Sequence, residues 1–458
     1  MFMLARYLAL ALLASPLVAK AGSETEALLV AASGGVLTTE ARGTEMLRSL
    51  PPGLDESWQT RRLRGEAFFN TPFVPAPSPA ALRDGLGPLF NSASCESCHN
   101  NLGRGRPADE EGSPSVSLVL QLSALRRAGT WGPHPRYGSN FNPQGVPGVP
   151  GEGKVRVTYA IVSGRYADGT RWEIQKPTYH FEQLAYGPID DAAVSPRMAH
   201  PLMGMGLLES VSDGDILANA DEDDEDGDGI SGRPNWVVDE RAGRRVGRFG
   251  WKANQVDVRA QTVAALLAEQ GISSEGTAVS NCAPVQTDCL AAPDGGRPGI
   301  STTDLDSIVT FMRTVPVSAR RGIENDAVRQ GAQLFRQAGC HACHVPGWRT
   351  GVVTDLPLLS DQSIYPFTDL LLHDMGPGLA DGRPDQSATR SEWRTPPLWG
   401  VGRVAELGVP SSFLHDGRAR TLEEAVLWHG GEAARSKSNF EALTEIDREA
   451  LIAFLHSL

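Results

Sequence analysis

Positive charge and long hydrophobic runs are both scarce in this sequence. Its 458 residues include 42 lysines and arginines against 55 aspartates and glutamates, and the formal net charge at pH 7 is −13. An acidic chain is poorly suited to nucleic acids, whose phosphates bind basic surfaces. Beyond the N-terminus no apolar run approaches the roughly 20 residues that cross a bilayer. We therefore expect no nucleic-acid partner and no membrane span in the mature chain.

The N-terminal stretch MFMLARYLALALLASPLVAKA predicts a secretory signal peptide over residues 1–21. Arg6 supplies its positive charge, residues 8–13 are a short apolar run, and residues 19–21 match a small-x-small cleavage site. The alternative is a membrane anchor, but the apolar run is too short to span a bilayer. We therefore expect the mature protein to be periplasmic.

Only six cysteines are present, and four of them form two copies of one pattern: CESCH at residues 95–99 and CHACH at residues 340–344. In an exported chain, Cys-x-x-Cys-His is the attachment site of a c-type haem. Each thiol forms a thioether with a haem vinyl group, and the histidine becomes an axial ligand of the iron. The sequence thus predicts two covalently bound haems, held by Cys95, Cys98 and His99 and by Cys340, Cys343 and His344.

Two other chemistries use closely spaced cysteines. Structural zinc needs four ligands, usually two neighbouring pairs, whereas these two motifs lie far apart in the chain. A thioredoxin-like dithiol belongs to a βαβ unit, which the sequence does not indicate. The last two cysteines, Cys282 and Cys289, lie in a polar loop with a proline, where an oxidising compartment favours a disulfide between them.

Similar sequences before and after each motif indicate an internal repeat. RLRGEAFFNTPF (62–73) and AVRQGAQLFRQAG (327–339) predict a helix before each motif. TTDLDSIVTFMRTVP (302–316) and LTEIDREALIAFLHSL (443–458) predict a closing amphipathic helix that begins at a threonine with acids in its first turn. A helix on each side of the haem motif is the outline of a cytochrome c domain.

The repeat therefore predicts a mainly α-helical fold of two tandem cytochrome c-like domains. Residues 22–321 would form the first domain and residues 322–458 the second. The first would carry a large insertion, about residues 115–300, in which SVSLVLQLS and KVRVTYAIVSG indicate some β-strand.

Several further stretches carry a family resemblance. LFNSASCESCHNNLGRGRP, SPRMAHPLMGMGLLES, DGDGISGRPNW and GRFGWKAN are similar to text of the di-haem oxidoreductase family. WRTPPLWGVGRVAELGVPSSFLHDGRARTLEEAVLWHGGEA resembles the C-terminal part of bacterial di-haem cytochrome c peroxidases and of the related tryptophan-tryptophylquinone maturase. The resemblance covers nearly the whole mature chain and keeps the order of the motifs.

The resemblance implies an enzyme, a peroxidase that reduces hydrogen peroxide with electrons from a small redox protein. The first haem would be the reaction site and the second the entry point for electrons. Two alternatives remain open: a non-enzymatic di-haem electron-transfer cytochrome, and an oxidase of a protein or polymer substrate, as in the maturase.

The resemblance also points to the ligands of the second haem. Relatives place the sixth ligand, a methionine or a tyrosine, just after a stretch like HDG…TLEEAV, and here that register falls on His429. We therefore expect His344 and His429 to be the axial ligands of the second iron. The alternatives are His373, Met375 and His415.

For the first haem, the resemblance implies a distal glutamate that moves the protons of peroxide. Glu152 and Glu209 are the candidate catalytic residues. The other possibility is a closed haem with a sixth ligand, for which the candidates are His134, His180, His200, Met203 and Met205. Trp251, in GRFGWKAN, is a candidate for the electron path between the haems.

The loop DEDDEDGDGISGRPN has carboxylates at alternating positions, Asp224, Asp226 and Asp228, followed by Gly229. Calcium-binding loops place oxygen ligands at positions one, three and five and glycine at six. Position twelve is Asn235 instead of the usual glutamate, and this departs from an EF-hand. The sequence predicts a calcium site here, and a solvated acidic loop is the alternative.

Overall fold

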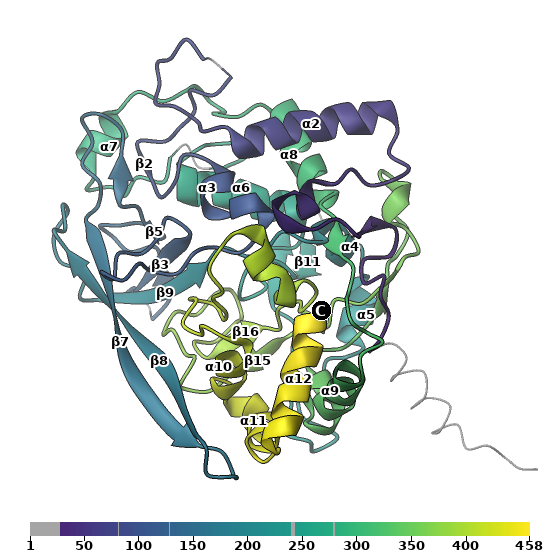
Figure 1. Ribbon diagram of the computed structural model, residues 1–458. Helices are drawn as coiled ribbons and strands as arrows, with labels where there is room; N and C mark the ends of the chain where they lie inside the picture. The colour runs from purple at the N-terminus through teal and green to yellow at the C-terminus, as the bar shows by residue number, and fades with distance from the viewer. Residues whose placement is uncertain (1–27, 81, 128, 240–242, 278–279) are drawn as a thin grey trace, which may run out of the picture.

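The computed structural model describes residues 28–80, 82–127, 129–239, 243–277 and 280–458 (Figure 1). The predicted signal peptide lies outside these residues. The described residues are 30% helical and 19% strand, with the strands in several small sheets. The prediction of a mainly α-helical fold of two cytochrome c-like domains is therefore wrong.

Two pairs of crossing helices flank the two motifs. α2 (Glu56–Asn70) packs on α8 (Thr302–Arg313), and α9 (Asp326–Gln337) packs on α12 (Glu445–Ser457) (Figure 1). Each helix begins at a side chain that accepts a backbone N–H: Asp55, Ser301, Asn325 and Thr444. The predicted helices before and after each motif are thus confirmed, although the cap of α8 is Ser301 and not a threonine.

Both helix pairs cross at a glycine. A Cβ atom on Gly65 would lie 1.9 Å from the carbonyl oxygen of Ser307, and one on Gly331 would lie 1.9 Å from the carbonyl oxygen of Ala450. The missing side chain lets the two backbones approach within van der Waals contact. The internal repeat is therefore present at the level of these helix pairs.

The strands that make the fold mixed lie mostly in the predicted insertion. β3 (Leu118–Leu125) pairs with β9 (Ala192–Met198) and with the short β4 (Trp131–Gly132) and β5 (Asn140–Phe141). Its register with β9 runs from Leu118 opposite Met198 to Ala124 opposite Ala192. Most side chains of β3 are buried, which explains its nearly continuous apolar sequence.

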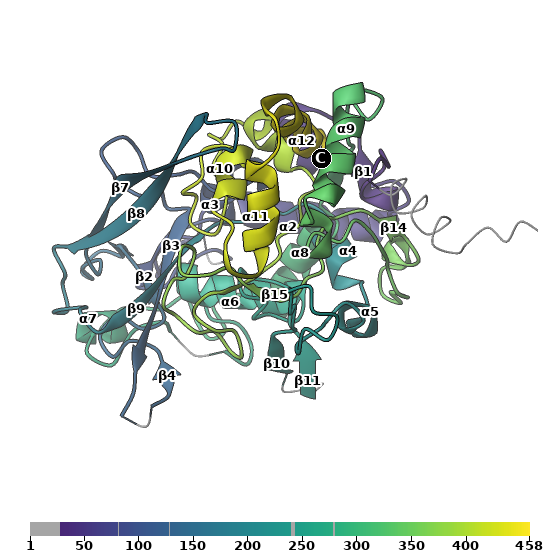
Figure 2. The same cartoon turned by 90° about the horizontal axis from the view of Figure 1, so that it is seen from below.

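A long antiparallel ribbon runs along one side of the molecule (Figures 1 and 2). It consists of β7 (Lys154–Arg165) and β8 (Arg171–Glu182). Its tip contacts the C-terminal helices, where the Tyr166 hydroxyl donates to Glu423 over 2.6 Å and Arg448 pairs with Asp168 over 2.8 Å. The strands expected from SVSLVLQLS and KVRVTYAIVSG are thus confirmed.

Most of the remaining elements are short. The α-helices are α3 (Cys95–Cys98), α4 (Met205–Glu209), α5 (Asp213–Leu217), α6 (Val258–Gln270), α7 (Thr287–Ala291), α10 (Leu422–Leu427) and α11 (Ala434–Glu441). The 3-10 helices are η1 (Gly35–Leu37), η2 (Gly43–Arg48), η3 (Asn100–Leu102), η4 (Cys340–Ala342), η5 (Pro357–Leu359), η6 (Val401–Leu407) and η7 (Gly431–Ala433).

Five two-stranded pairs complete the sheets. They are β1 (Thr38–Thr39) with β12 (Val317–Ser318), β2 (Leu89–Phe90) with β6 (Gln144–Gly145), β10 (Trp236–Asp239) with β11 (Gly243–Val246), β13 (Trp348–Arg349) with β14 (Ser363–Ile364), and β15 (Leu372–Asp374) with β16 (Glu392–Arg394). Between α9 and α10 the chain forms only 3-10 turns and strands of two or three residues. Glycine and proline recur there and end each element early.

One hydrophobic core runs through both halves of the chain, from Leu28 to Leu458. Each helix pair contributes the same aromatic contacts to it. Phe69 of α2 packs on Phe311 of α8 with ring centroids 5.4 Å apart, and Phe335 of α9 packs on Phe454 of α12 at 5.1 Å. Within the described parts of the chain, no helix combines the length and the apolar character needed to cross a bilayer.

The predicted disulfide is confirmed. Cys282 and Cys289 are bonded, with their Cα atoms 5.9 Å apart. Cys289 lies in the middle of α7 and is buried, so the bond holds the chain at Cys282 against this helix.

Candidate di-haem site

Both Cys-x-x-Cys-His motifs line a single cavity. It encloses about 2610 Å³, including space open to solvent. The motifs enter it from opposite halves of the sequence, and its wall is mostly apolar, with Phe69 and Phe335 of the two helix pairs among its members. The fold thus brings together the two sites that the sequence predicted separately.

The first motif starts in the single turn of α3. The Ser94 hydroxyl caps this turn by accepting the N–H of Ser97. His99 follows and uses its Nδ1 to donate to the carbonyl oxygen of His200 over 2.7 Å, which leaves Nε2 free. Burial lowers the pKa of His99 to about 4 and raises the pKa of Cys95 to about 11. The imidazole is therefore neutral, as a metal ligand must be.

The second motif has the same design with different local structure. Gly339, with φ of 87°, turns the chain from α9 into the 3-10 turn η4. His344 donates from Nδ1 to the carbonyl oxygen of Phe367 over 3.0 Å. Burial lowers the pKa of His344 to about 4 and raises the pKa of Cys340 to about 12. Again a neutral imidazole keeps its Nε2 free.

These observations fit two covalently attached haems. All four motif cysteines are free thiols, although Cys282 and Cys289 have formed a disulfide. Each motif histidine is oriented by a carbonyl hydrogen bond, as ligating histidines usually are. The apolar wall suits a flat, largely hydrophobic macrocycle.

His429 joins the same cavity. Thr421 caps α10, which ends at Leu427, two residues before His429. The His429 N–H still donates to Val426 over 3.1 Å, and its Nδ1 donates to the carbonyl oxygen of Ala425 over 2.8 Å. His429 therefore shows the same hydrogen-bond pattern as His99 and His344. Its role as a ligand stays a prediction.

A family comparison agrees with this arrangement. The family model described as "di-haem oxidoreductase, putative peroxidase" matches residues 28–119 and 143–458. The chain belongs to the di-haem oxidoreductase family. No curated protein is significantly similar to it. Within this di-haem oxidoreductase, the internal unmatched stretch, residues 120–142, holds most of β3 and the short β4 and β5.

The rival ligands of the second haem differ in availability. His373 is held between Asp369 at 2.7 Å and Glu432 at 2.6 Å. Burial opposes a charge on its ring, but the Asp369 carboxylate outweighs burial and raises the pKa of His373 well above its usual value. A charged imidazole with both nitrogens engaged has no lone pair for iron. His415 and Met375 also line the cavity of the di-haem oxidoreductase and remain alternatives.

The structure assigns neither predicted catalytic glutamate to the cavity. Glu152 is fully buried and accepts hydrogen bonds from the Asn142 N–H and the Gln286 side chain. Glu209 pairs with Arg313 over 2.6 Å and accepts the N–H of Val258 at the start of α6. Both carboxylates hold backbone and side chains in place. The sequence alone could not distinguish them from a catalytic acid, because structural and catalytic acids occur in similar sequence contexts.

Glu269 is the carboxylate that the sequence reasoning missed. It lies in the last turn of α6 and is the only acid among the described residues that line the cavity. Burial raises the pKa of Glu269 to about 7. The neighbouring Gln270 amide lies 3.5 Å from the Cys95 sulfur, so this end of α6 adjoins the first motif. One sequence signal was available: an acid in the last turn is unfavourable for the helix dipole.

The candidate sixth ligands of the first haem fall into two groups. His134 pairs with Asp191 at 3.0 Å, and His180 contacts the Thr158 hydroxyl at 2.9 Å on the β7–β8 ribbon; neither lines the cavity. The members of the second group line the cavity: His200, Met203 and Met205. His200 supports His99 through its carbonyl and stacks on Trp251, with ring centroids 4.0 Å apart.

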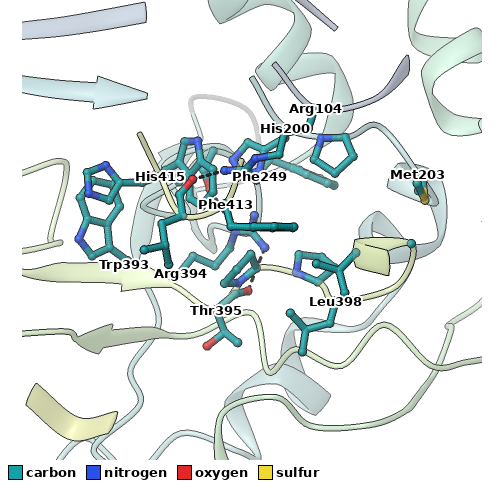
Figure 3. Close-up of a pocket in the computed structure, with 18 of the residues that line it drawn as sticks. Arg104, His200, Met203, Phe249, Trp393, Arg394, Thr395, Leu398, Phe413 and His415 are labelled. Carbon is teal, nitrogen blue, oxygen red and sulfur yellow. Dashed lines mark hydrogen bonds between the residues drawn. The ribbon is translucent and has the colours of Figure 1, made fainter. Parts of the chain in front are cut away.

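Trp251 lies in an aromatic wall of the cavity. Its indole N–H donates to the Met198 carbonyl over 2.8 Å. One side of its ring meets His200, and the ring of His415 lies 6.5 Å away, edge-on. His415 in turn stacks on Trp393 at 3.9 Å (Figure 3). The predicted position of Trp251 between the two motifs is compatible with this wall, and its part in an electron path stays a prediction.

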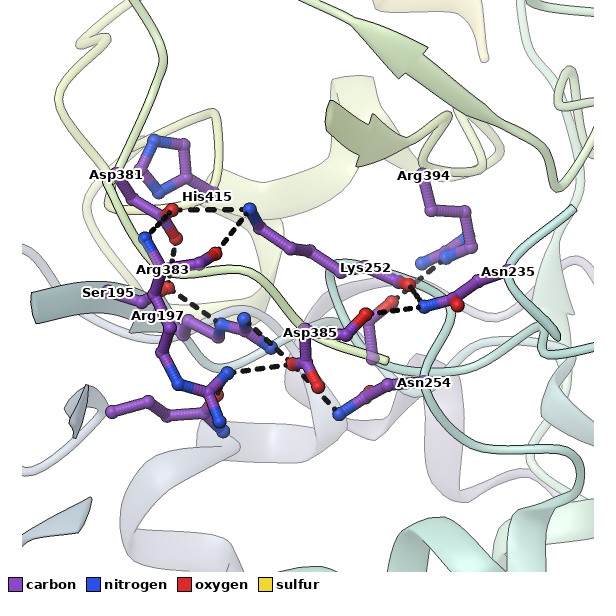
Figure 4. A network of polar contacts seen from close by, with 12 residues as sticks. Ser195, Arg197, Asn235, Lys252, Asn254, Asp381, Arg383, Asp385, Arg394 and His415 are labelled. Atoms are coloured by element: carbon purple, nitrogen blue, oxygen red, sulfur yellow. Dashed lines mark hydrogen bonds and ion pairs between the residues drawn. The ribbon is translucent and has the colours of Figure 1, made fainter. Parts of the chain in front are cut away.

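A buried polar network supports this wall from behind (Figure 4). Lys252 is fully buried, pairs with Asp381 over 3.2 Å and donates to the carbonyl oxygen of Thr389 over 2.7 Å. Burial lowers the pKa of Lys252 to about 8. Its ammonium lies 4.5 Å from the centre of the Trp393 ring. The network therefore fixes Trp393, and through it His415, against the cavity.

The acidic loop differs from the prediction in one member. Side-chain oxygens of Asp221, Asp224 and Asp226 lie within 4.8 Å of one another. Asp228 is not part of this group, and its carboxylate accepts the N–H of Ile230 over 2.8 Å. A calcium ion at this loop stays a prediction, with Asp221 in place of Asp228.

Proposed function

We propose that this di-haem oxidoreductase is a periplasmic peroxidase that reduces hydrogen peroxide to water with electrons from a small redox protein. The carrying observation is an asymmetry within one cavity. The only carboxylate of the described cavity wall, Glu269, adjoins the first motif, whereas the second motif shares the cavity with His429. The first haem would then do the chemistry and the second would pass electrons.

The residues of the first site divide the work as follows. A bound haem supplies an iron that changes oxidation state and can bind peroxide oxygen. Glu269 would take a proton from one oxygen of peroxide and give it to the other as the O–O bond breaks. Its pKa of about 7 suits both directions of transfer near neutral pH. Two electrons and two protons convert each peroxide molecule to two molecules of water.

The residues of the second site suit electron entry. His344 and His429 both present a neutral imidazole whose Nδ1 is fixed to a carbonyl. Two such ligands would close the second iron and leave no position for peroxide. Imidazole in place of a methionine ligand keeps the potential low, so the donor must be strongly reducing.

Location, donor and calcium belong to the same proposal. Residues 1–21 have the composition of a signal peptide, and haem attachment to paired cysteines suits an exported chain. The net charge of −13 favours a donor with a basic docking surface. Calcium at Asp221, Asp224 and Asp226 would have a structural role, because these three carboxylates do not line the cavity.

The direct test is peroxide turnover by the half-reduced protein, followed as a function of pH. Because the base form of Glu269 takes the first proton, kcat/KM should be high above about pH 7 and fall as the pH drops through that value. Protein that carries two haems yet consumes no peroxide would instead be an electron carrier. Oxidation of an added protein without peroxide turnover would favour the maturase-like alternative.

A further inference from the structure

Two buried arginines line the cavity without a carboxylate partner. Arg104 is 7% exposed and Arg394 is 5% exposed, and both side chains reach the cavity (Figure 3). Among the described residues neither forms an ion pair with a carboxylate. Other buried arginines do: Arg197 pairs with Asp385 over 3.0 Å, and Arg418 pairs with Asp416 over 2.8 Å.

The hydrogen bonds of these two arginines use only neutral groups. Arg104 donates to the carbonyl oxygen of Leu414, and its Nε is buried without a partner. Arg394 donates to the carbonyl oxygens of Gly250 over 3.0 Å and Thr395 over 3.1 Å. A guanidinium carries several N–H donors and a full charge. Carbonyl oxygens satisfy some of the donors and do not neutralise the charge.

Both guanidinium groups lie beside the same short segment of the wall, Gly250 and Trp251. The Arg104 guanidinium lies 5.3 Å from the centre of the Trp251 ring, and Arg394 bonds to the carbonyl of Gly250, the preceding residue. His415, in contact with Trp251, has a buried Nε2 without a partner. Two charges and a free ring nitrogen are thus buried together beside the space that the motifs face. The carboxylates that act on Arg104 and Arg394, Asp416 and Asp369, are bonded to other partners, Arg418 and His373. A buried charge that is only partly compensated is costly, so this space favours an anion.

We infer that Arg104 and Arg394 bind the carboxylate groups of the haems held by the two motifs. Each haem brings its own carboxylates into the cavity when its vinyl groups bond to the cysteines. The planar guanidinium matches a carboxylate with two parallel hydrogen bonds. This inference rests on membership of the di-haem family and not on peroxidase activity, so a failed turnover assay leaves it intact.

The test measures the midpoint potentials of both haems in Arg104→Gln and Arg394→Gln, by spectroelectrochemical titration at about pH 8, where free carboxylates are ionised. Loss of a nearby cation stabilises the oxidised, more positive iron, and the potential should fall. We expect roughly a tenfold rise in the ratio of oxidised to reduced haem at fixed applied potential for at least one haem, which corresponds to about 59 mV. Arg104→Lys and Arg394→Lys keep the charge and should stay near the wild-type potentials.

Arg320→Gln is the matched control. Arg320 is buried and bonds to the Leu28 carbonyl and the Ser457 hydroxyl, and burial lowers its pKa to about 10, as it does for Arg104 and Arg394. It does not line the cavity, so its loss should leave both potentials unchanged.

Three results decide the matter. Glutamine variants that carry two haems at wild-type potentials would overturn the inference. The arginines would then serve only as hydrogen-bond donors to backbone carbonyl groups. Lysine variants shifted as far as the glutamine variants would overturn it too, because charge would not be what matters. If the glutamine variants fail to mature with haem, the lysine variants decide: wild-type potentials support the inference, and failure to mature overturns it.

Discussion

The two haem-motif regions are alike in their supports and differ in their neighbours. In each region a phenylalanine from the preceding helix packs near the motif histidine with ring centroids 6.4 Å apart: Phe69 with His99, and Phe335 with His344. In each, the histidine donates to a backbone carbonyl. The likeness extends to the glycine at which each helix pair crosses. A shared scaffold thus holds both haem sites.

The neighbouring side chains differ between the two sites. The first motif adjoins Glu269, a carboxylate whose pKa burial raises to about 7. The second motif has His429 in its part of the cavity and, as its nearest acids, Asp369 and Glu432, which are occupied by His373. Under the proposed function, the motif fixes where a haem is attached, and the side chains around it decide whether the iron is available for chemistry.

The largest effect should come from removing the acid that distinguishes the first site. Glu269→Gln keeps the size and hydrogen-bonding capacity of the side chain but cannot exchange protons. Loss of a positioned acid–base group lowers rates by about 10²–10⁴-fold, so kcat/KM for peroxide should fall by that factor, and its rise near pH 7 should disappear. Steady-state peroxide assays across the pH range measure both.

Glu152→Gln is the control for that variant. Glu152 is also buried, and burial raises its pKa to about 8, but it lies outside the cavity. We expect its replacement to leave the pH profile of peroxide turnover unchanged. Equal losses in the two variants would mean that buried acids matter only for folding.

Replacing the feature that distinguishes the second site should change one haem alone. His429→Ala removes an imidazole from the cavity and should convert the second haem from low spin to high spin, with the first haem nearly unchanged. EPR spectra of the oxidised protein measure this change. A bis-histidine signal that survives the substitution would show that the ligand lies elsewhere, with His415 the next residue to replace.

A matched pair of glycine variants tests the shared scaffold. Gly65→Ala and Gly331→Ala each place a methyl group against a backbone carbonyl oxygen of the partner helix. Overpacking of this kind costs about 1–3 kcal/mol, so both variants should unfold at lower denaturant concentration. Gly65→Ala should disturb mainly the first haem spectrum and Gly331→Ala the second.

Gly214→Ala is the corresponding control. A Cβ atom there would have its nearest contact at 3.7 Å, the Ser212 hydroxyl, and we expect no loss of stability. Identical spectral changes in both helix-pair variants would contradict the division of the scaffold into two equivalent halves.

The effect with the least consequence for the haems is expected at the acidic loop, whose carboxylates lie outside the cavity. Calcium bound only to the folded protein would stabilise it, by about 2.7 kcal/mol at a free concentration one hundred times the dissociation constant. A chelator should therefore lower the melting temperature, and Asp224→Asn should reduce the shift. If elemental analysis finds no calcium and the chelator leaves melting unchanged, the loop is only solvated.

Local patterns in the sequence predicted the parts of the molecule that are themselves local. The two Cys-x-x-Cys-His motifs, the disulfide between Cys282 and Cys289, and the helices that pack at Gly65 and Gly331 could all be read from spacing and capping residues. The strands of the insertion could be read from the apolar residues of SVSLVLQLS and KVRVTYAIVSG. Each of these features depends on neighbours in the chain.

The features that sequence reasoning missed depend on contacts between distant segments. Three glutamates lie near apolar residues in the sequence: Glu152, Glu209 and Glu269. Only the packing of α6 against the first motif places Glu269 in the cavity. Arg104 and Arg394 lie beside Gly250 and Trp251 and come from opposite halves of the chain. The predicted fold class is wrong for a related reason. Two recognisable helix pairs suggest a mainly helical chain, but the glycines and prolines of the other segments allow only short elements there.

The most direct test of the central claim is an EPR and optical titration of the native protein from the oxidised to the half-reduced state, with cyanide added as an iron ligand. We expect one low-spin bis-histidine haem that does not bind cyanide. The other haem should be high spin, either in the oxidised or in the half-reduced state, and should bind cyanide. The cyanide-binding haem should be lost when Cys95 and Cys98 are replaced by alanine. If both haems are six-coordinate and bind no cyanide in any redox state, the proposed peroxidase function is wrong and the protein is an electron carrier.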